Sequence, residues 1–144
     1  MNTVVFGDGV AEAFAEGAVW AQMGTIGITA TTGIAARLGQ VRPEVMFVDA
    51  PVSGSKGPAE AGQLLILASG PPAAQPALEP VFAVIGRKTV WLGGAGRGSR
   101  MKLAVNAYMP ILIEGVSMPM SGSRTIGRAS VPTDSWRSQT RPAT

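Results

Sequence analysis

Short runs of consecutive apolar residues recur along the chain, and segments with helical periodicity separate them. Strands that are apolar on both faces are typical of a parallel sheet that helices cover on both sides. The sequence therefore predicts an α/β fold, with a mostly parallel sheet and helices on both of its faces.

The apolar runs predict strands, and the periodic segments between them predict helices. The expected strands span residues 4–6, 18–23, 44–48, 63–68 and 89–92. The expected helices span residues 10–16, 29–40, 71–85 and about 100–116. The third helix should kink or break at Pro80, because proline removes a helix hydrogen bond. Ser99 is the expected N-cap of the last helix.

Cysteine and histidine are both absent from the 144 residues. Their absence excludes disulfides, metal sites built on thiolate or imidazole ligands, and catalysis by a cysteine nucleophile or a histidine base. We therefore expect no metal site. Acid–base chemistry must then depend on Lys, Asp, Glu or Tyr, or on a bound group.

The net charge of +3 comes from the end of the chain. Residues 1–116 carry eight basic and eight acidic side chains, whereas residues 117–144 carry four arginines and one aspartate. Nucleic-acid surfaces need clustered cations on a folded face, so we expect no nucleic-acid partner; an alternative is that the basic tail binds one. Its composition predicts disorder, either as a natural tail or as a stretch with a shifted reading frame.

The start of the chain lacks the basic segment and the long apolar run of a secretory signal. No window reaches the roughly 18 apolar residues that a membrane span requires. We therefore expect a cytoplasmic protein that does not interact with a membrane.

Two glycine-rich loops carry the polar groups of interest. The first, residues 49–60, follows a predicted strand, and its Ser53 and Gly54 offer a hydroxyl and accessible backbone N–H groups. The second leads into the last helix, where Lys102 and Asn106 share a face by their i, i+4 spacing. Taken separately, these features are better explained by a tight turn and by a solvated lysine with a surface asparagine.

Together, the two loops resemble a known family. Residues 49–54 read D-A-P-V-S-G, which is similar to the substrate loop of the β-hydroxyacid dehydrogenases, the 3-hydroxyisobutyrate dehydrogenase-like enzymes. Residues 96–106 resemble the family's G-x-G-x-x-x-K-x-x-x-N helix. Within the family, residues 53–64 are most similar to the glyoxylate/succinic semialdehyde reductase branch.

The resemblance implies a fold, a cofactor and an activity. Residues 1–98 would form the C-terminal part of a Rossmann-like NAD(P)-binding domain, and residues 99–116 the start of a helix leading to an all-helical domain. The cofactor would be NADP or NAD, with NADP favoured. The substrate would be a small aldehyde or keto acid that carries a carboxylate. The family's dimerising helical domain implies a possible homo-oligomer.

The resemblance also implies the role of each site residue. Lys102 would be the general acid that protonates the carbonyl oxygen as the nicotinamide delivers a hydride. Ser53, Gly54 and Asn106 would bind the substrate carboxylate. Thr25 would lie against the cofactor.

The chain also departs from the family's pattern. It contains no G-x-G-x-x-G, the loop that seats the cofactor pyrophosphate at a helix N-terminus. The chain thus resembles the middle of such an enzyme, with weak or absent activity on its own. The alternative is a non-catalytic Rossmann-like remnant that acts as an interaction module.

Overall fold

The computed structural model describes residues 2–117, so the tail predicted at 117–144 lies outside the described residues except for Ser117. Helices and strands alternate along this part, as predicted. The strands are β1 (Val19–Gln22), β2 (Met46–Asp49), β3 (Val52–Ser53), β4 (Leu64–Ala68) and β5 (Gly86–Trp91). The helices are α1 (Asn2–Gly7), α2 (Ile28–Val41), α3 (Lys56–Glu60), a 3-10 turn η1 (Pro72–Ala74), α4 (Gln75–Ile85) and α5 (Arg97–Ser117).

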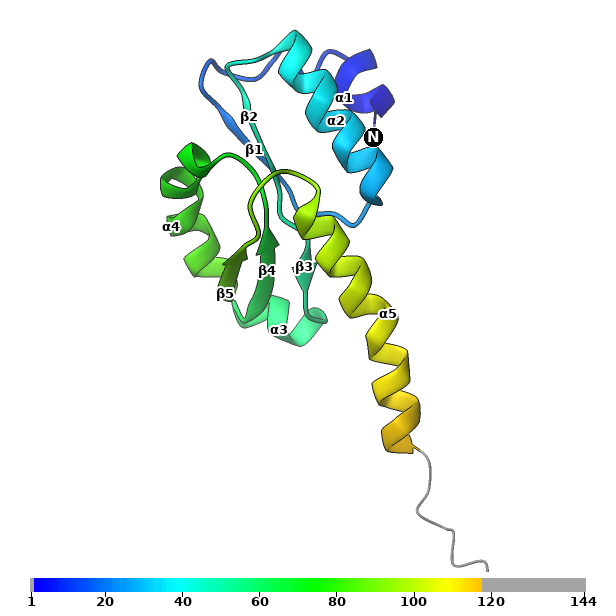
Figure 1. Ribbon diagram of the computed structural model, residues 1–144. Helices are drawn as coiled ribbons and strands as arrows, with labels where there is room; N and C mark the ends of the chain where they lie inside the picture. Colours follow the sequence, from blue (N-terminus) through cyan, green and yellow to red (C-terminus); the bar gives the residue numbers. More distant parts are fainter. Residues whose placement is uncertain (1, 118–144) are drawn as a thin grey trace, which may run out of the picture.

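Two parallel strand pairs meet end to end. β1 pairs with β2, and β4 pairs with β5, both in parallel. An antiparallel bridge between Asp49 and Ser69 joins the two pairs. β3 pairs with β4 in the antiparallel direction next to this bridge. The carboxyl ends of β2 and β4 therefore meet at one junction, and α5 begins beside it (Figure 1). Ligands of open α/β sheets bind beyond the carboxyl ends of strands, so this junction is the expected site.

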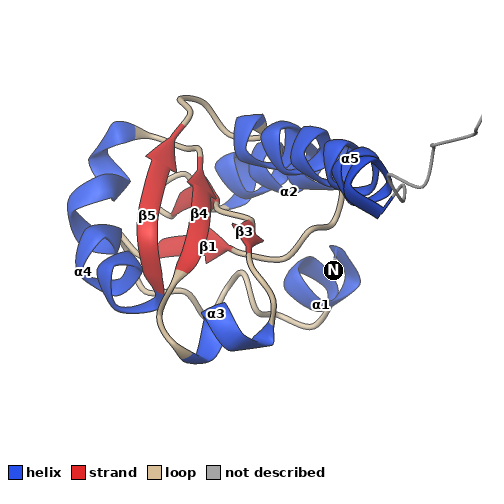
Figure 2. Cartoon of the chain, turned by 90° about the horizontal axis from the view of Figure 1, so that it is seen from below, coloured by secondary structure: helices blue, strands red, loops and turns tan. Residues whose placement is uncertain are grey.

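Helices cover both faces of the strands. On one face, Leu78 and Phe82 of α4 pack with Val48 of β2 and the buried residues of β4. On the other, buried residues of α1 and α2 pack around Phe47. Phe47 and Val48 are neighbours in β2 and enter different cores, as the alternation of strand side chains requires. Figure 2 shows α4 on one side of the strands and α2 on the other, which confirms the predicted α/β layers.

The N-terminal segment differs from its prediction. The strand expected at 4–6 is wrong, because these residues belong to α1. The helix expected at 10–16 is also wrong, because this segment consists of turns. The guanidinium of Arg42 donates hydrogen bonds to the carbonyls of Ala11, Glu12 and Phe14. These carbonyls therefore bond to a distant side chain rather than within a helix.

The remaining elements confirm most of the sequence predictions. The helix expected at 29–40 corresponds to α2, and its Ile34 and Leu38, four residues apart on one face, are fully buried. Of the kink or break expected at Pro80, the break is wrong, since α4 runs through this residue. Pro80 is exposed, so water can solvate the carbonyl that proline leaves unpaired. The two-residue strand β3 and the short helix α3 lack a periodicity that would have predicted them.

Arg42 also makes an acid-sensitive ion pair with Glu44. Its hydrogen bond holds the pKa of the Glu44 carboxyl below the ordinary value of 4.5. A carboxyl with a lowered folded-state pKa stabilises the fold above its unfolded pKa, and this contribution is lost as pH falls through the folded value. We therefore expect the urea midpoint to fall less in Glu44→Gln than in wild type between about pH 6 and about pH 3.

Glu60→Gln is the matched control, because Glu60 makes an exposed pair with Lys56 on α3. It should retain the acid dependence of wild type, since exposed pairs contribute little to stability. An equally steep loss of stability in Glu44→Gln and wild type would contradict the role of the Arg42 pair.

Candidate active site

The first turn of α5 is anchored to the strand junction. The backbone N–H of Ser99 donates to Oδ2 of Asp49 at 2.8 Å, and that of Gly98 donates to Oγ of Ser69 at 2.9 Å. The N–H groups of Arg97 and Arg100 bond to carbonyls of the preceding loop. The N–H groups of the first three helical residues, Arg97, Gly98 and Ser99, are thus all bonded outside the helix ladder, and Arg100 makes the first i→i−4 bond.

The prediction that Ser99 caps α5 is wrong. The helix begins at Arg97, so Ser99 lies inside its first turn. The capping group is instead the carboxylate of Asp49, which comes from β2. Local sequence rules consider only neighbouring residues, so they miss a cap that another strand supplies.

The buried side chain of Ser99 defines which face of α5 is turned toward the junction. It is 1% exposed, and its Oγ donates to Oδ1 of Asp49 at 2.7 Å. Lys102 and Asn106 follow Ser99 at i+3 and i+7, so all three lie along one face of the helix. Lys102 is half-buried, whereas Asn106 is exposed.

Ser53 and Gly54 follow Asp49 on the same stretch of chain. Ser53 is half-buried in β3, opposite Leu65 of β4. Gly54 has a φ of 148°, and a Cβ there would lie 2.8 Å from Cδ2 of Leu64. The positive φ therefore favours glycine at this position.

Asp49 connects both predicted halves of the site. Its backbone leads into Ser53 and Gly54, and its side chain holds the helix of Lys102 and Asn106. No hydrogen bond among residues 2–117 joins Lys102 to Ser53, so their meeting across the site stays a prediction.

The end of β1 contributes a further polar group that sequence reasoning missed. Gln22 is 7% exposed, and its Nε2 has no hydrogen-bond partner among the described residues. It is paired in register with Asp49. Thr25 follows in the loop to α2 and is exposed. The sequence position of Gln22 could have indicated this role, since a polar residue at the carboxyl end of an apolar strand often faces a ligand.

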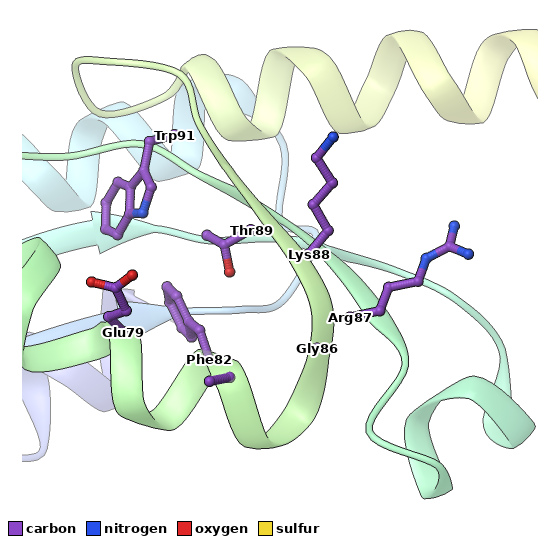
Figure 3. A pocket seen from close by; sticks show the side chains of 8 residues that line it. Glu79, Phe82, Gly86, Arg87, Lys88, Thr89 and Trp91 are labelled. Carbon is purple, nitrogen blue, oxygen red and sulfur yellow. The ribbon is translucent and has the colours of Figure 1, made fainter.

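Two pockets lie outside this set of residues. One, of about 370 Å³, lies between α4 and β5 and includes Phe82, Arg87 and Trp91 (Figure 3). The other, of about 400 Å³, lies against α5 beside Arg97 and Arg100. Neither contains a predicted site residue. Figure 3 shows the side chains of Arg87 and Lys88 pointing in different directions, so the first pocket gathers no cation pair.

Residues 2–117 contain no group of three or more acidic side chains that could hold a metal ion. None of the helices in this range is long and apolar enough to cross a membrane.

The residues at the junction fit the nicotinamide end of a dinucleotide cofactor. A buried amide donor without a partner is costly unless a ligand acceptor completes it. Nicotinamide and its ribose are rich in such acceptors. Gln22 and Thr25 would hold this end of the cofactor, which when bound supplies a hydride to the substrate.

The sequence of the chain matches one domain family over most of the described residues. The NAD binding domain of 6-phosphogluconate dehydrogenase matches residues 1–93. Glyoxylate/succinic semialdehyde reductase 1 of Arabidopsis thaliana is 40% identical over 116 residues, which are 80% of this chain and 39% of the relative. The 2-hydroxy-3-oxopropionate reductase of Escherichia coli (strain K12) is 30% identical over 118 residues, 81% of this chain and 40% of the relative.

A solved structure agrees with these relatives. The 3-hydroxyisobutyrate dehydrogenase of Salmonella typhimurium superposes with a TM-score of 0.69 and 29% identity, over 78% of this chain and 39% of that one. The chain therefore spans about two fifths of the length of the proteins that it matches.

Fold and sequence together define an NAD-binding domain of the Rossmann-like class. The chain belongs to the family of the NAD binding domain of 6-phosphogluconate dehydrogenase, and with it to the β-hydroxyacid dehydrogenases. The family resemblance seen in the sequence is thereby confirmed, as is the class of cofactor.

Proposed function

We propose that this chain belongs to a reductase that transfers a hydride from NADPH or NADH, with NADPH favoured, to a small aldehyde or keto acid. Substrates of the glyoxylate or succinic semialdehyde type fit best, because the relative with 40% identity is named for them. Residues 1–98 would form part of the cofactor domain, and residues 99–116 the start of the helix that leaves it. The carboxylate of Asp49, which bonds the helix of Lys102 from the start of the 49–54 loop, is the observation that best supports the proposal.

In this proposal, one charged side chain would donate a proton, and uncharged groups would bind the substrate. The ammonium of Lys102 would donate a proton to the substrate oxygen as it becomes an alcohol. The backbone N–H of Gly54, the hydroxyl of Ser53 and the amide of Asn106 would bind the substrate carboxylate. Helix α5 would keep Lys102 and Asn106 on one face, so that both groups reach the same small molecule.

The 144-residue chain on its own should bind the cofactor weakly, because it contains no G-x-G-x-x-G loop for the pyrophosphate. We expect no saturable NADPH binding in the micromolar range by calorimetry, and no turnover. Saturable micromolar binding would contradict this part of the proposal.

The substrate proposal is tested in a chimera. Residues 2–109 replace the matching segment of the Arabidopsis reductase, which supplies the rest of the enzyme. We expect NADPH oxidation to depend on glyoxylate or succinic semialdehyde, and the unaltered Arabidopsis enzyme is the positive control. A folded chimera that binds NADPH but reduces neither aldehyde would contradict the proposal and favour the interaction module.

A further inference from the structure

Asp49 is fully buried, and its carboxylate collects hydrogen bonds from several elements. Oδ1 accepts from Oγ of Ser99, while Oδ2 accepts from the N–H of Ser99 and, at 3.2 Å, from Oγ of Ser69. A carboxylate without water is costly unless donors surround it. Asp49 has three donors in the folded chain, so its burial is compensated.

The hydroxyl protons around Asp49 have a consistent assignment. The Ser99 hydroxyl donates to Asp49, and the Thr31 hydroxyl of α2 donates to the carbonyl oxygen of Gly27 at 2.8 Å. The two hydroxyl oxygens lie 3.2 Å apart, in contact but without a proton between them. Ser69 Oγ donates to Asp49 and accepts the N–H of Gly98. Each of these side chains is at most 1% exposed. The hydrogen bonds therefore link β2, the end of β4 and α5, and α2 contacts this network through Thr31.

The network fixes both the position of α5 and its rotation about its own axis. The Ser99 N–H bond places the helix start over the junction, where the positive end of the helix favours the carboxylate. The Ser99 Oγ bond turns one face of the helix toward β2. Lys102 and Asn106 lie on this face, so their direction depends on a bond made one turn earlier.

We infer that Asp49 is a positioning residue that sets Lys102 against the Ser53–Gly54 loop. This inference rests on the proposed function, because it concerns the same site. Asp49 fixes both parts at once: its backbone begins the loop, and its side chain orients the helix. It touches neither substrate nor cofactor in this role.

The test follows the lysine side chains in the free chain and requires no turnover. The chain contains three lysines, Lys56, Lys88 and Lys102, so ¹³C-methylated lysines give few resonances. In the unsubstituted chain we expect an NOE between the methyl groups of Lys102 and protons of Ser53 or Gly54. If folded protein shows no such NOE, the inference is wrong, whatever the chimera does.

Asp49→Asn keeps the shape of the side chain but places a donor where an acceptor is needed. We expect the Lys102 resonance to move toward that of the exposed Lys56, while Lys56 and Lys88 stay unchanged. The amide protons of Gly98 and Ser99 should exchange about tenfold faster or more. Glu60→Gln, at an exposed carboxylate of α3, is the matched control and should change neither signal.

A capping role without positioning predicts a different result. In that case the amide protons of α5 exchange faster in Asp49→Asn, while the Lys102 resonance and its NOE stay as in wild type; this outcome overturns the inference. Should Asp49→Asn fail to fold, Ser99→Ala, which removes the Oγ bond and keeps the backbone bond, must shift Lys102 in the same way. If neither variant folds, the NOE between Lys102 and Ser53 or Gly54 in the unsubstituted chain decides whether the inference stands: its absence overturns the inference. A chimera without turnover but with the expected Lys102 shifts would contradict the proposed function alone.

Discussion

Gly98→Ala is expected to destabilise the chain by about 3 kcal/mol. A Cβ at this position would overlap the carbonyl oxygen of Leu67 and lie 2.8 Å from that of Asp49. Both obstacles are backbone atoms of strands or strand ends, so no side-chain rotation relieves the overlap. The start of α5 would have to move away from the junction, which would break the bonds to Ser69 and Asp49.

Urea unfolding followed by tryptophan fluorescence measures this effect. The matched control is Gly39→Ala in α2, where an added Cβ meets nothing within 4 Å. Because alanine is a better helix former than glycine, Gly39→Ala should raise the free energy of unfolding by about 0.5–1 kcal/mol. A Gly98→Ala midpoint equal to that of wild type would show that α5 does not pack as described.

Gly98 also shows what the sequence could predict about the site and what it could not. The glycine-rich loop and the spacing of Lys102 and Asn106 were visible as a pattern, and they identified the helix. The reason for the glycine is the close approach of the helix start to two strands. That approach depends on the antiparallel bridge between Asp49 and Ser69, which no local pattern indicates.

Predictions succeeded where neighbouring residues decide the structure. The apolar runs that became β1 and β2 form strands whose two faces pack into different cores. The periodic segment that became α2 forms a helix whose buried residues share one face. These signals lie within a single element, so one sequence is enough to detect them.

Predictions failed where a distant side chain satisfies the backbone. Residues 10–16 were expected to be helical, but Arg42 bonds their carbonyls from beyond α2. Ser99 was expected to cap α5, but Asp49 supplies the cap from β2. In both places a polar side chain replaces the local hydrogen bonds that propensity rules assume. Asp49 is the first residue of the D-A-P-V-S-G motif, but its role as the cap of α5 is visible only in the three-dimensional structure.

Lys102→Met in the chimera is expected to lower kcat by about 10²- to 10⁴-fold, the usual contribution of a positioned general acid. Methionine keeps most of the length and apolar stem of lysine, so the packing of α5 should persist. Cofactor binding should stay near that of the parent chimera, because the proposed role of Lys102 concerns the substrate oxygen.

Tyr108 of α5 and Asp49 of β2 are poor substitutes for Lys102 as the proton donor. Tyr108 is exposed and does not follow Ser99 at helical spacing, so it lies on another face. Asp49 uses its oxygens to hold the helix. The matched control is Lys88→Met, which removes an exposed ammonium from β5 and should leave kcat within about threefold of the parent. If Lys102→Met also stays within this range, another group donates the proton, and the role given to α5 is wrong.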